Sequence, residues 1–256
     1  MVGIPGLGGN ARCFDFLAER LGAAGHGMVN VDLRGRGRSS VSALGSYGWR
    51  QHARDVLAVA ARFGSGPVDL VGHSMGALVA MQAAALAPGA VRRIVDLDAV
   101  GLPDPLAAAV IMQVASRLAY PGPSVESYLA RVRRIGVFEP WNEYWEQVFR
   151  YELTADDGSV RPLTSLRAVM EDTFYACWHD PRRLWASLTV PVLLVRAARP
   201  LLPGPGRRGA GLVVSPEDLD RFVAAVPQAR VADVDANHYG VLMHESTASA
   251  VVEFLR

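Results

Sequence analysis

The sequence predicts an α/β fold, with a mostly parallel sheet, helices on both of its faces and a helical segment inserted between two strands. Short runs of β-branched residues alternate with segments of helical periodicity, which is typical of β-α-β units. Several runs are apolar on both faces, as a sheet covered on both sides requires. The alternation stops between residues 101 and 188, where only helical patterns follow one another.

The expected strands are short and lie on both sides of this interruption, at residues 2–4, 28–33, 68–71, 93–97, 190–195 and 229–234. Helical patterns separate them and close the chain, at residues 11–23, 49–63, 75–87, 216–226 and 246–255. The Pro- and Gly-rich stretch 199–211 predicts a loop. We therefore expect a core made of residues 1–100 and 189–256.

Residues 101–188 are expected to form a helical cap without strands, with helices at residues 106–118, 125–135, 140–151 and 166–178. Four of the five tryptophans lie in it: Trp141, Trp145, Trp178 and Trp185. Some of these rings are expected to form the apolar core of the cap, and others to line an apolar substrate pocket. We assign Trp141, Trp145 and Trp178 to that pocket, together with Tyr239.

The composition is that of a packed protein, with 50% hydrophobic residues, 20% charged residues and a formal net charge of +1. This balance gives no reason to expect nucleic acid or an anionic membrane as a partner. The positive charges are all arginine, so Schiff-base, P-loop and Ser-Lys chemistry are excluded. Cys13 and Cys177 form no disulfide framework, and neither a signal peptide nor a membrane span is visible. We predict a cytoplasmic location.

The pentapeptide Gly72-His73-Ser74-Met75-Gly76 has the pattern G-x-S-x-G between an expected strand and an expected helix. A serine on so tight a turn is exposed as a nucleophile, and glycine fits at both flanking positions because other side chains would clash there. The serine also stands at a helix N-terminus, which favours developing negative charge. We predict that Ser74 is the nucleophile.

The loop Pro5-Gly6-Leu7-Gly8-Gly9 follows the first strand and lets the backbone approach a substrate closely. Acyl transfer needs two N–H groups aimed at the oxyanion. We assign these to Leu7 and to Met75, the residue after the nucleophile. A phosphate-binding loop is disfavoured, because neither its lysine nor the G-x-G-x-x-G spacing is present.

Among the six histidines, His238 is the one that follows a core strand at its carboxyl end, where the ligand sites of parallel sheets gather. We predict that His238 is the general base, with His244 as the competing candidate. No metal site is predicted.

The segments VNVDLRGRGRSS and LVGHSMGA resemble the α/β-hydrolase family, and the likeness extends over nearly the whole chain. This resemblance implies a cofactor-free serine hydrolase that cleaves an apolar carboxylic ester, thioester or lactone through an acyl-enzyme. A serine at the nucleophile position argues against dehalogenase and epoxide-hydrolase chemistry. The same residues could serve a carbon–carbon bond hydrolase, an acyltransferase, a cyclase or a ligand-binding module of low turnover.

The first departure from the family concerns the catalytic acid. The usual position follows the strand after the cap, but no carboxylate occurs from Arg196 until Glu217. The other position used in the family is the end of the strand after the nucleophile helix, where this chain has Asp98. We assign Asp98 to orient His238, with Asp96 as the alternative.

The second departure is at the start of the chain, where only residues 1–4 precede the glycine-rich loop and the family usually has two strands. Either the start is truncated or the sheet has fewer strands. The strand at residues 28–33 would then be an exposed edge and could pair with a second subunit in a homodimer. Arg34, Arg36 and Arg38 in the next turn are expected to be solvated.

Overall fold

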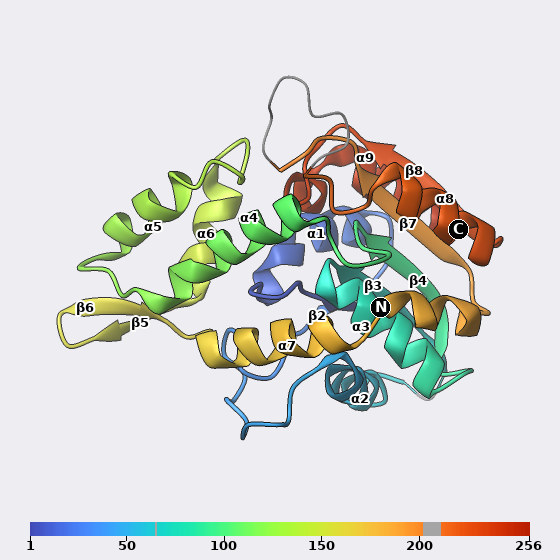
Figure 1. Ribbon diagram of the computed structural model, residues 1–256, viewed down its shortest axis with the longest axis horizontal. Helices are drawn as coiled ribbons and strands as arrows, with labels where there is room; N and C mark the ends of the chain where they lie inside the picture. Colours follow the sequence, from blue (N-terminus) through green and yellow to red (C-terminus); the bar gives the residue numbers. More distant parts are fainter. Residues whose placement is uncertain (65, 202–210) are drawn as a thin grey trace.

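The computed structural model describes residues 1–64, 66–201 and 211–256. In these residues six strands form one sheet in the order β2-β1-β3-β4-β7-β8, and every pair of neighbouring strands is parallel. The strands are β1 (Val2–Ile4), β2 (Val29–Asn30), β3 (Val68–His73), β4 (Val91–Leu97), β7 (Val192–Ala197) and β8 (Ala229–Val234). The predicted α/β fold is confirmed (Figure 1).

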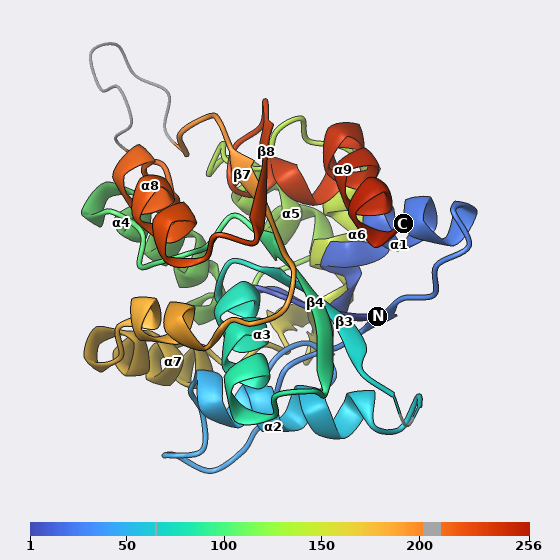
Figure 2. The same cartoon turned by 90° about the vertical axis from the view of Figure 1, so that its right-hand side faces the viewer.

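Helices cover both faces of the sheet (Figure 2). They are η1 (Ala11–Phe14), α1 (Asp15–Ala23), α2 (Trp49–Ala60), α3 (Met75–Leu86), η3 (Pro181–Ser187), α8 (Pro216–Ala225), η4 (Gly240–Met243) and α9 (Glu245–Leu255). The helices α1 and α9 pack on one face with Val71 and Val95, whereas α2, α3 and α8 pack on the other with Leu70 and Ile94. Successive strand residues therefore enter opposite cores, which explains why the strands are apolar on both faces.

The segment 101–188 leaves the sheet after β4 and returns to it at β7 (Figure 1). Besides η3 at its end, its helices are α4 (Pro105–Ala115), η2 (Ser116–Ala119), α5 (Val125–Arg133), α6 (Glu143–Tyr151) and α7 (Leu166–Trp178). The expectation that it contains no strand is wrong, because β5 (Leu153–Asp156) and β6 (Ser159–Pro162) form an antiparallel hairpin. Asp157 and Gly158 both have positive φ, 40° and 77°, which is the geometry of a two-residue hairpin turn. We call residues 101–188 the insertion.

Several predicted boundaries shift in ways that matter for function. The strand β3 runs on to His73, so it ends directly at Ser74, and β7 reaches Ala197. The edge strand β2 has two residues, Val29–Asn30, instead of the six expected at 28–33. The predicted loop 199–211 lies largely outside the described residues. In the described chain, no helix combines the length and apolarity that crossing a membrane would need.

Candidate active site

Ser74 stands on a strained turn between β3 and α3. Its backbone has φ 56° and ψ −125°, a conformation rarely adopted by a residue with a side chain. A Cβ atom on Gly72 would lie 2.3 Å from the Gly76 carbonyl oxygen, and one on Gly76 would lie 2.0 Å from the Ile4 carbonyl oxygen. The two flanking glycines are therefore a steric requirement of this turn. The turn places Ser74 at the edge of the sheet that is formed by the carboxyl ends of the strands.

His238 follows β8 and lies buried next to this turn. Its Nδ1 atom is 2.9 Å from Oδ2 of Asp98, which is fully buried directly after β4. The other Asp98 oxygen, Oδ1, accepts a hydrogen bond from the Ala197 N–H at 3.0 Å. The contact that the sequence predicts between Asp98 and His238 is therefore present. It leaves the Nε2 atom as the ring nitrogen that is free to act on Ser74.

The alternative acid, Asp96, is also fully buried but has a different surrounding. Its Oδ1 accepts the Ala99 N–H at 2.8 Å, and its Oδ2 has no hydrogen-bond partner among the described residues. Burial raises the pKa of Asp96 well above its usual value. Asp96 thus supports the turn after β4, and among the described residues its hydrogen bond goes to Ala99 and not to His238.

His73 holds the loop that carries His238. Its Nε2–H donates to the His238 carbonyl oxygen at 2.8 Å, and the centroids of the two rings are 4.5 Å apart. Burial, reinforced by the neighbouring His238, lowers the pKa of His73 well below 6.5. The competing base, His244, caps α9 by accepting the Ser246 N–H and lines neither cavity next to Ser74.

Both predicted oxyanion donors lie near Ser74, since Met75 follows it directly and Leu7 lines the same two cavities. Gly9 donates its N–H to the Gly6 carbonyl oxygen at 3.1 Å, which closes a tight turn with Leu7 and Gly8 at its centre. Met75 is the first residue of α3, so its N–H has no partner within the helix. In the described part of the chain, no backbone carbonyl accepts a hydrogen bond from Leu7 N–H or Met75 N–H. Both groups are therefore available to an oxyanion.

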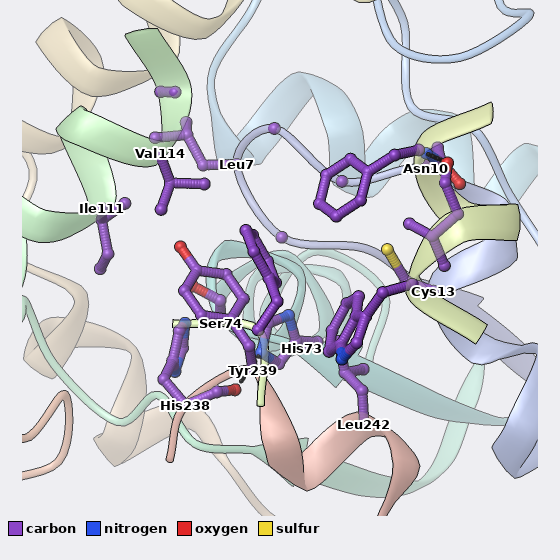
Figure 3. Close-up of a pocket in the computed structure, with 18 of the residues that line it drawn as sticks. Leu7, Asn10, Cys13, His73, Ser74, Ile111, Val114, His238, Tyr239 and Leu242 are labelled. Atoms are coloured by element: carbon purple, nitrogen blue, oxygen red, sulfur yellow. Dashed lines mark hydrogen bonds between the residues drawn. The ribbon is translucent and has the colours of Figure 1, made fainter. Parts of the chain in front are cut away.

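Two cavities of the described structure meet at Ser74. The first contains His238 and Tyr239 and is largely aromatic; Figure 3 shows these two side chains beside Ser74, with Asn10 and Cys13 at the far end. Its further aromatic and aliphatic walls come from the insertion: Ile111, Val114, Phe138, Trp145, Val148 and Phe149. The second cavity is aliphatic and runs between α3, α4 and α7, along Leu78, Leu102, Met112, Ala176 and Val213. The nucleophile thus faces two apolar compartments.

The predicted substrate-binding residues divide into two groups. Trp145 and Tyr239 line the aromatic cavity, and burial raises the pKa of the Tyr239 hydroxyl. The assignment of Trp141 and Trp178 is corrected, because neither side chain lines a cavity at Ser74. Trp141 stacks on Phe149 at 6.0 Å, and Trp178 is 74% exposed at the end of α7.

The expectation of a solvated turn at Arg34, Arg36 and Arg38 is wrong for its middle member. Arg38 is exposed and Arg34 is paired with Asp55, but Arg36 is fully buried and paired with Asp172 of α7. The sequence could not reveal this burial, because the countercharge lies more than a hundred residues away.

Comparison with known proteins agrees with this geometry. Residues 1–254 match the alpha/beta hydrolase family. Over 98 residues the chain is 40% identical to N-formylmaleamate deformylase of Pseudomonas putida, an alignment that covers 38% of this chain and only 36% of that protein. It is 29% identical over 210 residues to 2-(acetamidomethylene)succinate hydrolase of Mesorhizobium japonicum, covering 77% of this chain and 69% of that protein.

The solved structure of E-2-(acetamidomethylene)succinate hydrolase has the same fold, with a TM-score of 0.82 at 24% identity over 100% of this chain and 90% of the other. The parallel sheet and the serine on its strained turn define a hydrolase of the α/β class. The chain belongs to the alpha/beta hydrolase family.

Proposed function

We propose that this chain is a serine hydrolase that cleaves a carboxylic ester, thioester or lactone through an acyl-enzyme. The observation that carries the proposal is the combination of a strained Ser74 with the buried His238–Asp98 pair at the same edge of the sheet. A histidine held through Nδ1 presents Nε2 as a base, which is the arrangement that activates a serine hydroxyl.

In the proposed reaction, His238 Nε2 takes the hydroxyl proton of Ser74 while the Ser74 oxygen bonds to the substrate carbonyl carbon. The Leu7 and Met75 N–H groups bind the oxyanion, and the Asp98 carboxylate stabilises the imidazolium. The imidazolium then gives its proton to the departing alcohol or thiol, which leaves an acyl group on Ser74. Finally, His238 deprotonates a water that attacks this acyl group, and the imidazolium returns that proton to the Ser74 oxygen as the acid product leaves.

The walls of the two cavities favour an apolar, uncharged substrate. Among the described residues that line them, Arg117 is the one cation, and its charge is balanced by Glu152. An anionic substrate would therefore meet no free positive charge in this part of the site. Acyl groups with aliphatic or aromatic character match the cavities better.

A second candidate is hydrolysis of an amide-type bond. It is favoured by the names of two relatives, a deformylase that acts on N-formylmaleamate and a hydrolase of 2-(acetamidomethylene)succinate. Acyl transfer and cyclisation use the same triad and differ in what accepts the acyl group, whereas carbon–carbon bond cleavage differs in the bond that is broken. A homodimer through β2 and a cytoplasmic location remain predictions from the sequence.

A panel of p-nitrophenyl esters tests the proposal. We expect turnover of neutral esters that rises as the acyl chain grows and is weaker for a succinyl hemiester of similar length. Ser74→Ala should abolish this turnover, whereas Ser116→Ala, which removes an exposed hydroxyl bound to the Gln113 carbonyl, should leave it unchanged. A preference for the anionic ester, or turnover that survives in Ser74→Ala, would contradict the proposal.

A further inference from the structure

Two buried arginines hold consecutive carbonyl groups of the glycine-rich loop. Arg36 Nε–H donates to the Leu7 carbonyl oxygen at 3.2 Å, and Arg117 Nη2–H donates to the Gly8 carbonyl oxygen at 2.7 Å. Arg36 is 0% exposed and Arg117 is 6% exposed. A buried guanidinium is costly unless it is paired, so these contacts are specific features of the fold.

The countercharges of both arginines come from the insertion. Arg36 pairs with Asp172 of α7, and Asp172 is fixed further by the Gly48 N–H and by His52. Arg117 forms a two-point contact with Glu152, which follows α6, with nitrogen–oxygen distances of 3.0 and 2.8 Å. The Tyr128 hydroxyl of α5 donates to the same carboxylate at 2.6 Å. Each arginine therefore joins the loop to a carboxylate of the insertion.

Arg117 lines the aromatic cavity, but four of its five N–H groups already donate to protein oxygens. Besides Glu152 and Gly8, its Nη1 atom donates to the Val114 carbonyl oxygen at 3.0 Å. With its charge balanced and its donors directed at protein atoms, Arg117 is not arranged to bind a substrate anion. Its position fits a structural task on the loop itself.

Holding these carbonyls fixes the direction of the Gly8 and Gly9 N–H groups. Gly9 N–H in turn donates to the Gly6 carbonyl oxygen, which belongs to the peptide that carries Leu7 N–H. The C=O and N–H of one trans peptide point in opposite directions, so the Leu7 and Gly8 carbonyls set the planes of the two peptides that follow Leu7. The Leu7–Gly8 peptide is the central one of the turn, and the common β-turn types differ by a flip of that peptide. Gly8 can adopt the positive φ that the flipped turn needs, so the contact of Arg36 with the Leu7 carbonyl opposes the flip.

We propose that Arg36 and Arg117, with Asp172 and Glu152, are positioning residues that keep the glycine-rich loop in the shape that presents Leu7 N–H to the oxyanion. The insertion thereby controls transition-state stabilisation as well as covering the cavities. This inference rests on the proposed hydrolysis at Ser74. It makes the two ion pairs matter for the rate of acylation more than for substrate binding.

The test compares double variants in which a buried ion pair is replaced by neutral residues of similar size, since such replacements are often tolerated. Arg117→Met with Glu152→Gln removes the hold on Gly8. The matched control is Arg34→Met with Asp55→Asn, an ion pair of the same turn as Arg36 that contacts the Ser46 carbonyl instead of the loop. Arg36→Lys is the second test variant, because lysine retains a cation beside Asp172 but lacks the Nε–H that reaches Leu7.

We expect kcat for a neutral ester to fall roughly 10- to 100-fold in Arg117→Met/Glu152→Gln and in Arg36→Lys, with little change in KM. Affinity for a trifluoromethyl ketone, which forms an oxyanion on Ser74, should fall in parallel. Affinity for the carboxylate product should stay the same, and the control should match the unsubstituted enzyme in all three. If Arg117→Met/Glu152→Gln does not fold, the inference is tested by the kcat and the inhibitor affinity of Arg36→Lys alone.

Folded test variants with unchanged kcat would overturn the inference. A loss of kcat that is no larger in the test variants than in the control would overturn it as well. A change confined to KM would also overturn it, because it would show a role in substrate binding. Absence of any esterase activity in the unsubstituted enzyme would instead refute the proposed function, so the two failures are distinguishable.

Discussion

Replacing Asp98 by asparagine tests the contact on which the proposed mechanism depends. The Asp98 carboxylate divides its two oxygens between two neighbours, His238 Nδ1 at 2.9 Å and the Ala197 N–H at 3.0 Å. An asparagine offers one oxygen and one NH2 group to the same two positions. Which group faces which neighbour decides the tautomer of His238.

With the amide oxygen on Ala197 N–H, the NH2 group faces His238 Nδ1, and the ring hydrogen moves to Nε2. Such a ring cannot accept the Ser74 proton. In the opposite orientation the NH2 group faces the Ala197 N–H, and leaving these buried donors without acceptors costs about 1–3 kcal/mol. At about 2 kcal/mol, roughly 3% of the molecules hold the active tautomer. The imidazolium also loses its counterion, so kcat should fall about 10⁴-fold, as in well-studied serine protease triads.

Steady-state hydrolysis of a p-nitrophenyl ester measures this loss. Asp96→Asn is the matched control, because Asp96 is buried on the same strand and hydrogen-bonds the Ala99 N–H instead of His238. We expect Asp96→Asn to retain turnover and to affect mainly stability. A folded Asp98→Asn enzyme that keeps activity within about tenfold of the original would refute the assignment, since a wrong tautomer cannot support that rate.

Three further predictions concern the turn around the nucleophile. Ser74→Gly removes the side chain from a residue strained at φ 56°. This change should abolish turnover and raise the free energy of unfolding, measured in urea, by about 1 kcal/mol. An unchanged urea midpoint of unfolding would contradict the strain. Gly76→Ala should prevent folding, as judged by circular dichroism, because its Cβ would meet the Ile4 carbonyl oxygen at 2.0 Å. The lowered pKa of His73 means that below pH 6.5 the unfolded chain binds a proton that the folded chain rejects. The free energy of unfolding should therefore fall as the pH drops below 6.5, and His73→Gln should flatten this slope; an unaltered slope would exclude His73 as its source.

The sequence alone predicted the parts of the site that depend on local rules. The G-x-S-x-G pattern is recognised within five residues, although Gly72 is required by the close approach of Gly76 and Gly76 by the close approach of the Ile4 carbonyl. Asp98 and His238 could be brought together because parallel strands end at the same edge of the sheet. These predictions needed no knowledge of side-chain packing.

Features that depend on distant partners were predicted wrongly or missed. Arg36 reads as a surface residue until Asp172, far along the chain, is packed against it. Trp178 lies on the outer side of α7, and helical periodicity alone did not separate that side from the side facing the cavity. The hairpin at β5 and β6 did carry a signal, since Asp157-Gly158 is a typical hairpin turn.

The central claim is that Ser74 is an activated nucleophile, and labelling with a fluorophosphonate tests it most directly. The account predicts that the folded protein gains the mass of one phosphonyl group, that peptide mapping places it on Ser74, and that Ser74→Ala blocks labelling while Ser116→Ala does not. Asp98→Asn should slow the labelling rate, because the reaction needs the same base. A folded, unsubstituted protein that stays unlabelled, or that carries the label on another residue, would contradict the account.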